Sequence, residues 1–216
     1  MSKRLSRLQA RVLAVLAGIE PTWTLTGGAA LAGFHLGHRV TRDLDLFWHG
    51  ARSISAMRRE VLTRLEADGL EVEALRTTES FCSLLVRDGQ ESVVVDLVAE
   101  PVPSIEQPES QRIGDVEIAV DSKHEILVNK LCALLHRSEV RDLLDIASLV
   151  EAGGDLERAM RDAPRKDGGF SALTLGWSLS NWKVADAARA GGMEERVDEL
   201  ERFLQRLLRI AAGERP

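Results

Sequence analysis

A pair of glycines followed by two alternating aspartates constrains the fold of this chain more than any other feature. Gly27 and Gly28 lie between a short apolar run and an alanine-rich segment with helical character. Fifteen residues beyond Gly28, Asp43 and Asp45 alternate with leucines, a pattern typical of a strand. The order strand, glycine turn, helix, strand predicts a sheet in which the turn faces two carboxylates.

Strands and helices are mixed over the first 121 residues. Helical periodicity predicts helices over 5–19, 28–36 and 54–67. The expected strands are 23–26, 44–48, 71–76, 81–87, 92–98 and 116–120, with a loop rich in Pro, Glu and Gln over 100–112.

The pattern changes after residue 121, where almost every segment is helical. The expected helices are 123–136, 139–152, 155–163, 171–189 and 193–212. The chain is therefore expected to be an α+β protein with two domains. Residues 1–121 would form a mixed sheet with flanking helices, and 122–216 a helical bundle that contributes to the same cleft.

Composition limits the classes of protein to consider. With 216 residues, of which 44% are hydrophobic, the chain can bury a core without metal or disulfide staples. The net charge of −6 excludes a basic nucleic-acid binder, so RNA would need a local patch. Cys82 and Cys132 lie in apolar runs and are expected to be free thiols. No apolar run of signal or membrane-spanning length begins the sequence, so a soluble cytoplasmic protein is expected.

Asp43 and Asp45 suggest a metal site. Residues two apart on a strand point to the same face, and adjacent carboxylates repel unless a cation or a proton lies between them. Mg²⁺ prefers such oxygen ligands and is usually bound by one or two carboxylates plus substrate phosphates. The alternative is a pair of exposed aspartates on an edge strand.

Neighbouring residues favour phosphate binding beside this pair. Thr26, Gly27 and Gly28 lie between a strand and a helix, where glycines let the backbone amides approach a phosphate. Arg39 and Arg42 precede Asp43, and the planar arginine fork suits phosphate oxygens. A plain strand-to-helix turn and solvated surface arginines are the respective alternatives.

Asp96 provides a third carboxylate. It lies in a run of valines that reads as a central strand, where an unpartnered aspartate is costly to bury. A metal beside it would offset that cost, and Asp96 could also serve as the general base. A role as a simple strand-end cap is the alternative.

The helical half contains a lysine in an apolar setting. The neighbours of Lys130 at helical spacing are Ile126, Leu127, Ala133 and Leu134. Its ammonium must either reach out of a buried face or meet an anion in a cleft.

These features together resemble the DNA polymerase β-type nucleotidyltransferase superfamily. Within it, two segments are similar to the AbiEii/AbiGii toxin family: the run Leu25-Thr-Gly-Gly-Ala-Ala-Leu-Ala, and the run His38-Arg-Val-Thr-Arg-Asp-Leu-Asp-Leu-Phe47. The run from Lys130 to Asp145 also resembles the family's helical motif, in which a lysine precedes R-x-x-x-R-D-x-x-D.

The resemblance implies an NTP-dependent and metal-dependent nucleotidyltransferase. Asp43, Asp45 and Asp96 would hold Mg²⁺ or Mn²⁺ and act in catalysis together with Lys130. The expected nucleotide-binding residues are Thr26, Gly27, Gly28, Arg39, Lys130, Asp142 and Asp145. Internal salt bridges are an equal alternative for Asp145.

The resemblance also implies a biological setting. The chain would be a toxin of a toxin–antitoxin or phage-resistance system, with tRNA as the acceptor, a cognate antitoxin as partner and no membrane association. The alternatives are transfer to a small molecule or a protein hydroxyl, and a catalytically silent nucleotide-binding protein.

Two further groups are expected to be structural. Arg158, Arg161, Arg165 and Lys166 form a basic cluster that reads as a solvated helix face rather than an RNA contact. Trp177 and Trp182 are expected to lie in the core rather than to stack on bases.

Overall fold

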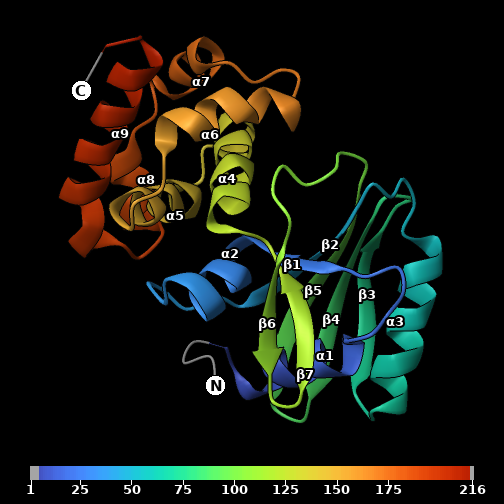
Figure 1. Ribbon diagram of the computed structural model, residues 1–216. Helices are drawn as coiled ribbons and strands as arrows, with labels where there is room; N and C mark the ends of the chain where they lie inside the picture. Colours follow the sequence, from blue (N-terminus) through green and yellow to red (C-terminus); the bar gives the residue numbers. More distant parts are fainter. Residues whose placement is uncertain (1–4, 215–216) are drawn as a thin grey trace. The chain divides into compact units, whose positions relative to one another are not determined.

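A computed structural model describes residues 5–214 (Figure 1). The chain divides into two compact units, one ending at Ser122 and the other beginning at Lys123. The first contains a mixed sheet with helices, and the second is helical. The expected α+β class is thereby confirmed.

The first unit is built on a seven-stranded sheet with the order β3-β4-β5-β2-β1-β7-β6. Its strands are β1 (Thr24–Thr26), β2 (Asp43–His49), β3 (Glu71–Thr77), β4 (Phe81–Asp88), β5 (Glu91–Glu100), β6 (Glu109–Ile113) and β7 (Val116–Val120). β2 pairs in parallel with β5, and β1 in parallel with β7, while the remaining pairs are antiparallel. The parallel pairing of β2 with β5 joins strands that are far apart in the sequence.

The expected loop over 100–112 is wrong at its C-terminal end. Residues Glu109–Ile113 form β6, which pairs with β7 through a tight connection at Gly114, where φ is +57°. β6 is a polar, largely exposed edge strand, so it lacks the apolar alternation that marks the other strands. Pairing with β7, rather than its own side chains, makes this segment a strand.

The two faces of the sheet differ in burial. Along β2, Leu44, Leu46 and Trp48 are buried while the residues between them are only partly so, and β5 follows the same alternation. Helix α1 (Arg7–Leu16) contacts α3 (Ser55–Ala67) and β5, and α3 also contacts β3 (Figure 1). The buried face therefore forms the core, and the opposite face carries the acidic residues.

A short helix follows the glycine pair. α2 (Gly27–Ala30) continues directly as a π-helical turn over Leu31–His35, so the helix expected over 28–36 is present in a more irregular form. Ala29, Ala30 and Leu31 are fully buried. The small alanines allow this helix to lie close to the sheet, where it contacts β1 and β2.

The second unit is a bundle of short helices. They are α4 (Lys123–Arg137), α5 (Val140–Glu151), α6 (Leu156–Asp162), α7 (Ala172–Leu179), α8 (Val184–Ala190) and α9 (Val197–Ala211). Helix α9 buries Leu200, Leu204 and Leu207 on one stripe, as its periodicity predicts. No helix within residues 5–214 is both long enough and apolar enough to cross a membrane.

The single helix expected over 171–189 is wrong. The segment forms α7 and α8, separated by a break around Ser180 and Asn181. The hydroxyl of Ser180 donates to the carbonyl oxygen of Trp177 at 2.9 Å. Ser and Asn favour helix ends because their side chains compete for backbone hydrogen bonds.

Candidate functional site

The candidate site lies on the partly exposed face of the sheet. Asp43 and Asp45 of β2 share this face because they are two residues apart. Asp96 of β5 is the direct partner of Asp45 in the parallel register. The strand pairing thus brings together three carboxylates that are separated by up to 53 residues in the sequence.

Ser83 of β4 is the partner of Asp96 on the other side. The two residues are opposite one another in the antiparallel register, and the Ser83 hydroxyl donates to Oδ1 of Asp96 at 2.5 Å. Ser83 is not among the site residues predicted from the sequence. The signal was present, because Ser83 is a small polar residue that alternates with buried positions on a strand.

The environment of Asp96 changes its acidity. Burial raises the pKa of Asp96 above its usual range, the hydrogen bond from Ser83 opposes that shift, and the negative charge of Asp43 raises the pKa further. Asp96 is therefore a better proton acceptor than an exposed aspartate, and it interacts electrostatically with Asp43.

The turn at Gly27 lies against the carboxylates. Thr26 pairs with Asp45 in the β1–β2 register, and Gly27 follows with φ of +63°. A Cβ at residue 27 would lie 2.2 Å from Oδ2 of Asp45, so only glycine fits here. The Thr26 hydroxyl is buried and has no hydrogen-bond partner in the described part of the chain.

Gly28 lies against Arg39 in a similar way. A Cβ at residue 28 would be 2.6 Å from Nη2 of Arg39 and 3.2 Å from Oγ1 of Thr41. The guanidinium of Arg39 therefore lies beside the first turn of α2, where backbone amides are free of helix partners. Arg42 and Asp43 line a neighbouring pocket of about 540 Å³.

The acidic residues fit a divalent cation that is shared with a phosphate ligand. Within residues 5–214, no three His, Cys, Asp or Glu side chains converge closely enough to hold a metal by themselves. Mg²⁺ usually requires only one or two protein carboxylates and completes its shell with water and phosphate oxygens. The repulsion between Asp43 and Asp96 is the kind that a cation relieves. The donor set thus suits Mg²⁺ bound together with a triphosphate.

Lys130 has partners within the helical unit. Its ammonium lies 2.7 Å from Oδ1 of Asp142 and 2.9 Å from Oδ2 of Asp145, and all three side chains are at least 90% buried. Burial lowers the pKa of Lys130, but the charges of Asp145 and Asp142 outweigh that effect and raise it. Arg137 also donates to both oxygens of Asp142. This cluster joins α4 to α5.

The predicted site residues therefore form two groups. Thr26, Gly27, Gly28, Arg39, Asp43, Asp45 and Asp96 belong to the sheet unit, and Lys130, Asp142 and Asp145 to the helical unit. Within each group, neighbouring residues are in contact or paired in register.

The basic cluster noted in the sequence is largely neutralised. Arg158, Arg161 and Arg165 lie within 4 Å of Asp162 or Glu157. The expectation that Lys166 is a solvated residue is wrong: its side chain is only 5% exposed, and its ammonium lies 2.5 Å from Oε1 of the buried Glu125.

The core position expected for Trp177 is also wrong. Trp177 is 81% exposed on α7, whereas Trp182 is intermediate. The helix presents Leu175 and Leu179 to the interior instead, and this places Trp177 on another face.

Comparisons with known proteins agree with this architecture. The family described as nucleotidyl transferase AbiEii toxin, type IV TA system, matches residues 11–209. No curated protein matches the chain significantly.

Solved structures share the fold. MenT4, a nucleotidyltransferase toxin from Mycobacterium tuberculosis H37Rv, aligns with a TM-score of 0.59 at 19% identity, covering 96% of this chain and 86% of its own. JHP933 from Helicobacter pylori aligns with a TM-score of 0.56 at 20% identity, covering 97% of this chain and 95% of its own. The family match spans nearly the whole chain, and so this protein belongs to the AbiEii family of nucleotidyl transferase toxins.

Proposed function

We propose that the chain transfers a nucleotide from an NTP to an acceptor hydroxyl in a reaction that depends on Mg²⁺, with Mn²⁺ as a substitute. The observation that carries this proposal is the pairing of Asp45 with Asp96, with Asp43 on the same face and Gly27 in contact range of Asp45. Carboxylates beside a glycine turn provide a metal site next to a phosphate cradle.

Each residue of the sheet unit has a role in this reaction. Asp43 and Asp45, with Asp96 beside them, would hold the cation together with phosphate oxygens, and the cation would supply charge stabilisation for the transferring phosphoryl group. The amides after Gly27 and Gly28 and the guanidinium of Arg39 bind phosphate oxygens. Thr26 adds a buried hydroxyl that has a free hydrogen-bonding capacity within the described residues.

Asp96 also suits the role of general base. Its raised pKa strengthens it as a proton acceptor. The acceptor oxygen would form a bond to the α-phosphorus and lose its proton to Asp96. The bond from the α-phosphorus to the bridging oxygen would break, and pyrophosphate would leave.

The nucleotide-binding roles of Lys130, Asp142 and Asp145 stay predictions. The geometry supports an internal role for them, because the ammonium already contacts both carboxylates. A lysine has three donors, so one can still reach a phosphate. The contribution of the helical domain to the nucleotide cleft is proposed on the same basis.

We further propose tRNA as the acceptor, a cognate antitoxin as the partner and the cytoplasm as the location. The description of the family as a type IV toxin–antitoxin system supports the antitoxin. A small molecule or a protein hydroxyl is the alternative acceptor. A silent nucleotide-binding protein is the less favoured alternative, because a degenerate copy would be expected to lose at least one of Asp43, Asp45 and Asp96.

Label transfer tests the proposal. The protein is incubated with Mg²⁺, total RNA or lysate, and each NTP labelled at the α- or the γ-phosphate. Label from the α-position, but not the γ-position, should appear on the acceptor. Asp43→Asn should abolish transfer, whereas Asp115→Asn, in the exposed connection between β6 and β7, should not. Equal transfer by Asp43→Asn, or neither transfer nor Mg²⁺-dependent NTP binding by the wild type, would contradict the proposal.

Growth of a bacterial host tests the toxin assignment separately. Expression of the wild type should arrest growth, and Asp45→Asn should restore it. Equal growth with both proteins would remove the toxin claim and leave the enzyme claim intact.

A further inference from the structure

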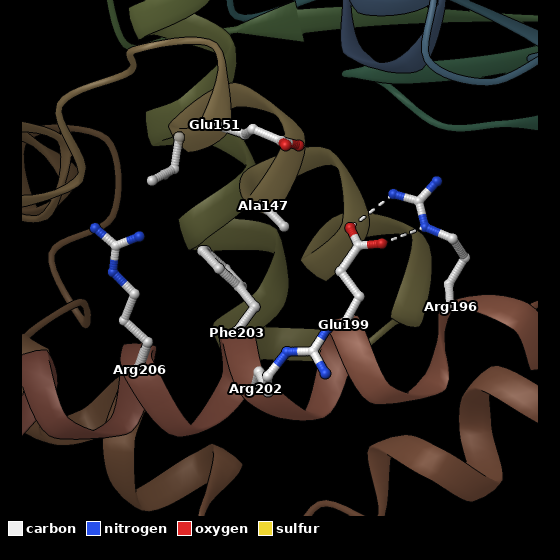
Figure 2. A pocket seen from close by; sticks show the side chains of 8 residues that line it. Ala147, Glu151, Arg196, Glu199, Arg202, Phe203 and Arg206 are labelled. Carbon is white, nitrogen blue, oxygen red and sulfur yellow. Dashed lines mark hydrogen bonds and ion pairs between the residues drawn. The ribbon is translucent and has the colours of Figure 1, made fainter.

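A groove between α5 and α9 of the helical unit has the features of a second ligand site. Its volume is about 520 Å³, and Ala147 and Phe203 lie at its base. Figure 2 shows Phe203 between the side chains of Arg206 and Glu199, all three projecting from α9. The groove is thus apolar at its base and charged along its sides.

One of its arginines is held by an internal partner. Arg196 forms a bidentate pair with Glu199, with Nε–Oε2 and Nη2–Oε1 distances of 2.6 and 2.7 Å (Figure 2). The hydrogen bond and the charge of Glu199 help to raise the pKa of Arg196, and the charge of Glu151 adds to this effect. Arg196 is therefore neutralised within the protein.

Arg202 and Arg206, unlike Arg196, have no internal partner among the described residues. Both are exposed, and neither makes an ion pair with any carboxylate of residues 5–214. They are four residues apart, so they share a helix face and are separated by about 6 Å along the axis. Like charges at this spacing slightly destabilise a helix, and an anion bound to both would relieve the repulsion. Several other arginines of the unit, such as Arg158 and Arg189, have acidic partners.

The remaining groups of the groove restrict the ligand. Glu151 of α5 contributes a carboxylate, which can accept hydrogen bonds from a ribose hydroxyl or a base amino group. The apolar base provided by Ala147 and Phe203 suits a planar ring. Two exposed guanidinium groups can bind an anion, and the arginine fork matches phosphate.

We propose that this groove binds nucleotide units, with Arg202 and Arg206 as the phosphate ligands. The phosphate can belong to a free nucleotide or to an RNA strand. The binding step goes beyond the proposed transfer reaction and needs none of Asp43, Asp45 and Asp96. A net charge of −6 for the whole chain makes such a local site necessary for any contact with RNA.

Fluorescence anisotropy on the full-length protein tests the site. The probes are a fluorescent ATP and a fluorescent single-stranded RNA of ten nucleotides, both in EDTA so that the metal-dependent site does not contribute. The variant R202A/R206A removes the proposed ligands. The variant R59A/R209A is the matched control, because Arg59 and Arg209 are exposed helical arginines outside the groove, and it changes the net charge equally.

We expect R202A/R206A to weaken binding at least tenfold relative to R59A/R209A and to reduce the salt slope of RNA binding by about 1.4, since each phosphate contact to a single strand contributes about 0.7. If R202A/R206A loses binding of the RNA probe alone, the ligand is an RNA strand. If it loses binding of the ATP probe alone, the ligand is a free nucleotide. Equal affinities for the two variants, or no binding of either probe by the wild type, would overturn the proposal.

Two controls separate this result from other effects. Thermal unfolding of both variants checks the fold, and R202K/R206K, which keeps the charge, should bind more tightly than R202A/R206A. If the wild type transfers label but the groove binds neither probe, only the groove proposal is overturned. If the groove binds the probes but the wild type shows neither label transfer nor Mg²⁺-dependent NTP binding, the groove proposal stands and the transferase proposal is overturned.

Discussion

The backbone of Gly27 lies directly against the carboxylate of Asp45. A Cβ at residue 27 would be 2.2 Å from Oδ2 and 3.0 Å from Cγ of Asp45, and the φ angle of Gly27 is +63°. Both the close approach and the left-handed backbone require glycine. The turn and the carboxylate therefore form one unit, in which a change at either residue displaces the other.

Gly27→Ala should destabilise the protein by about 1–3 kcal/mol and abolish nucleotide transfer, because the methyl group displaces Asp45 and strains the turn. Gly18→Ala is the matched control: its φ is +73°, but no atom lies within 4 Å of the added Cβ. Urea unfolding and label transfer provide the measurements. Equal activity of the two variants would show that the contact with Asp45 is dispensable.

Lys130→Met should lower the free energy of unfolding by about 3–5 kcal/mol, because it removes the cation that bridges the two buried carboxylates of Asp142 and Asp145. Lys183→Met, at an exposed position, is expected to change it by less than about 0.5 kcal/mol. Denaturant unfolding compares the two. If Lys130→Met is as stable as the control but no longer binds NTP, the predicted phosphate role is favoured over the structural one.

The acidity of Asp96 predicts how stability depends on pH. Because the folded-state pKa is raised, folding disfavours the ionised form, and the stabilising contribution of the neutral acid is lost as pH rises through that pKa. Asp96→Asn should therefore gain stability over the wild type as the pH is raised from about 4 to 7, since the unfolded value is about 3.9. The comparison is made by urea unfolding in EDTA, and a difference independent of pH would contradict it.

Ser83→Ala tests the hydrogen bond to Asp96. Loss of this donor removes an interaction that lowers the pKa of Asp96, so the acid limb of the pH–activity profile should move to higher pH. Ser110→Ala, on the edge strand β6, should leave the profile unchanged. An unchanged acid limb in Ser83→Ala would mean that Asp96 does not control this part of the profile.

Much of the fold could be predicted from local patterns. Alternation identified the strand at 44–48, and a run of valines identified the one at 92–98, which the turn signal Asp88-Gly89 joins to 81–87. In the structure each of these strands has one buried face. Two segments could not be identified in this way. β6 is polar and is ordered by its partner strand, and the break between α7 and α8 lies in a segment that has helical periodicity on both sides.

The candidate site also has features that the sequence predicts and features that depend on tertiary packing. Spacing alone predicted that Asp43 and Asp45 share a face, but the partners of buried charges depend on which helices pack together. Lys166 illustrates this limit, because it reads as part of a basic surface cluster yet lies buried against Glu125, 41 residues away. Lys130 was recognised as unusual, and the structure supplies its partners on α5.

The sequence by itself determined most of the secondary-structure pattern, the acidic face of β2 and the need for glycine between strand and helix, since these depend on side-chain periodicity and backbone freedom over a few residues. Only the tertiary structure decided that Asp96 is the neighbour of Asp45, that Ser83 donates to it, and that Arg202 and Arg206 remain without acidic partners in the described chain. Such features depend on residues that are not adjacent in the sequence, and strand register and the packing of buried surfaces decide which of those residues become neighbours.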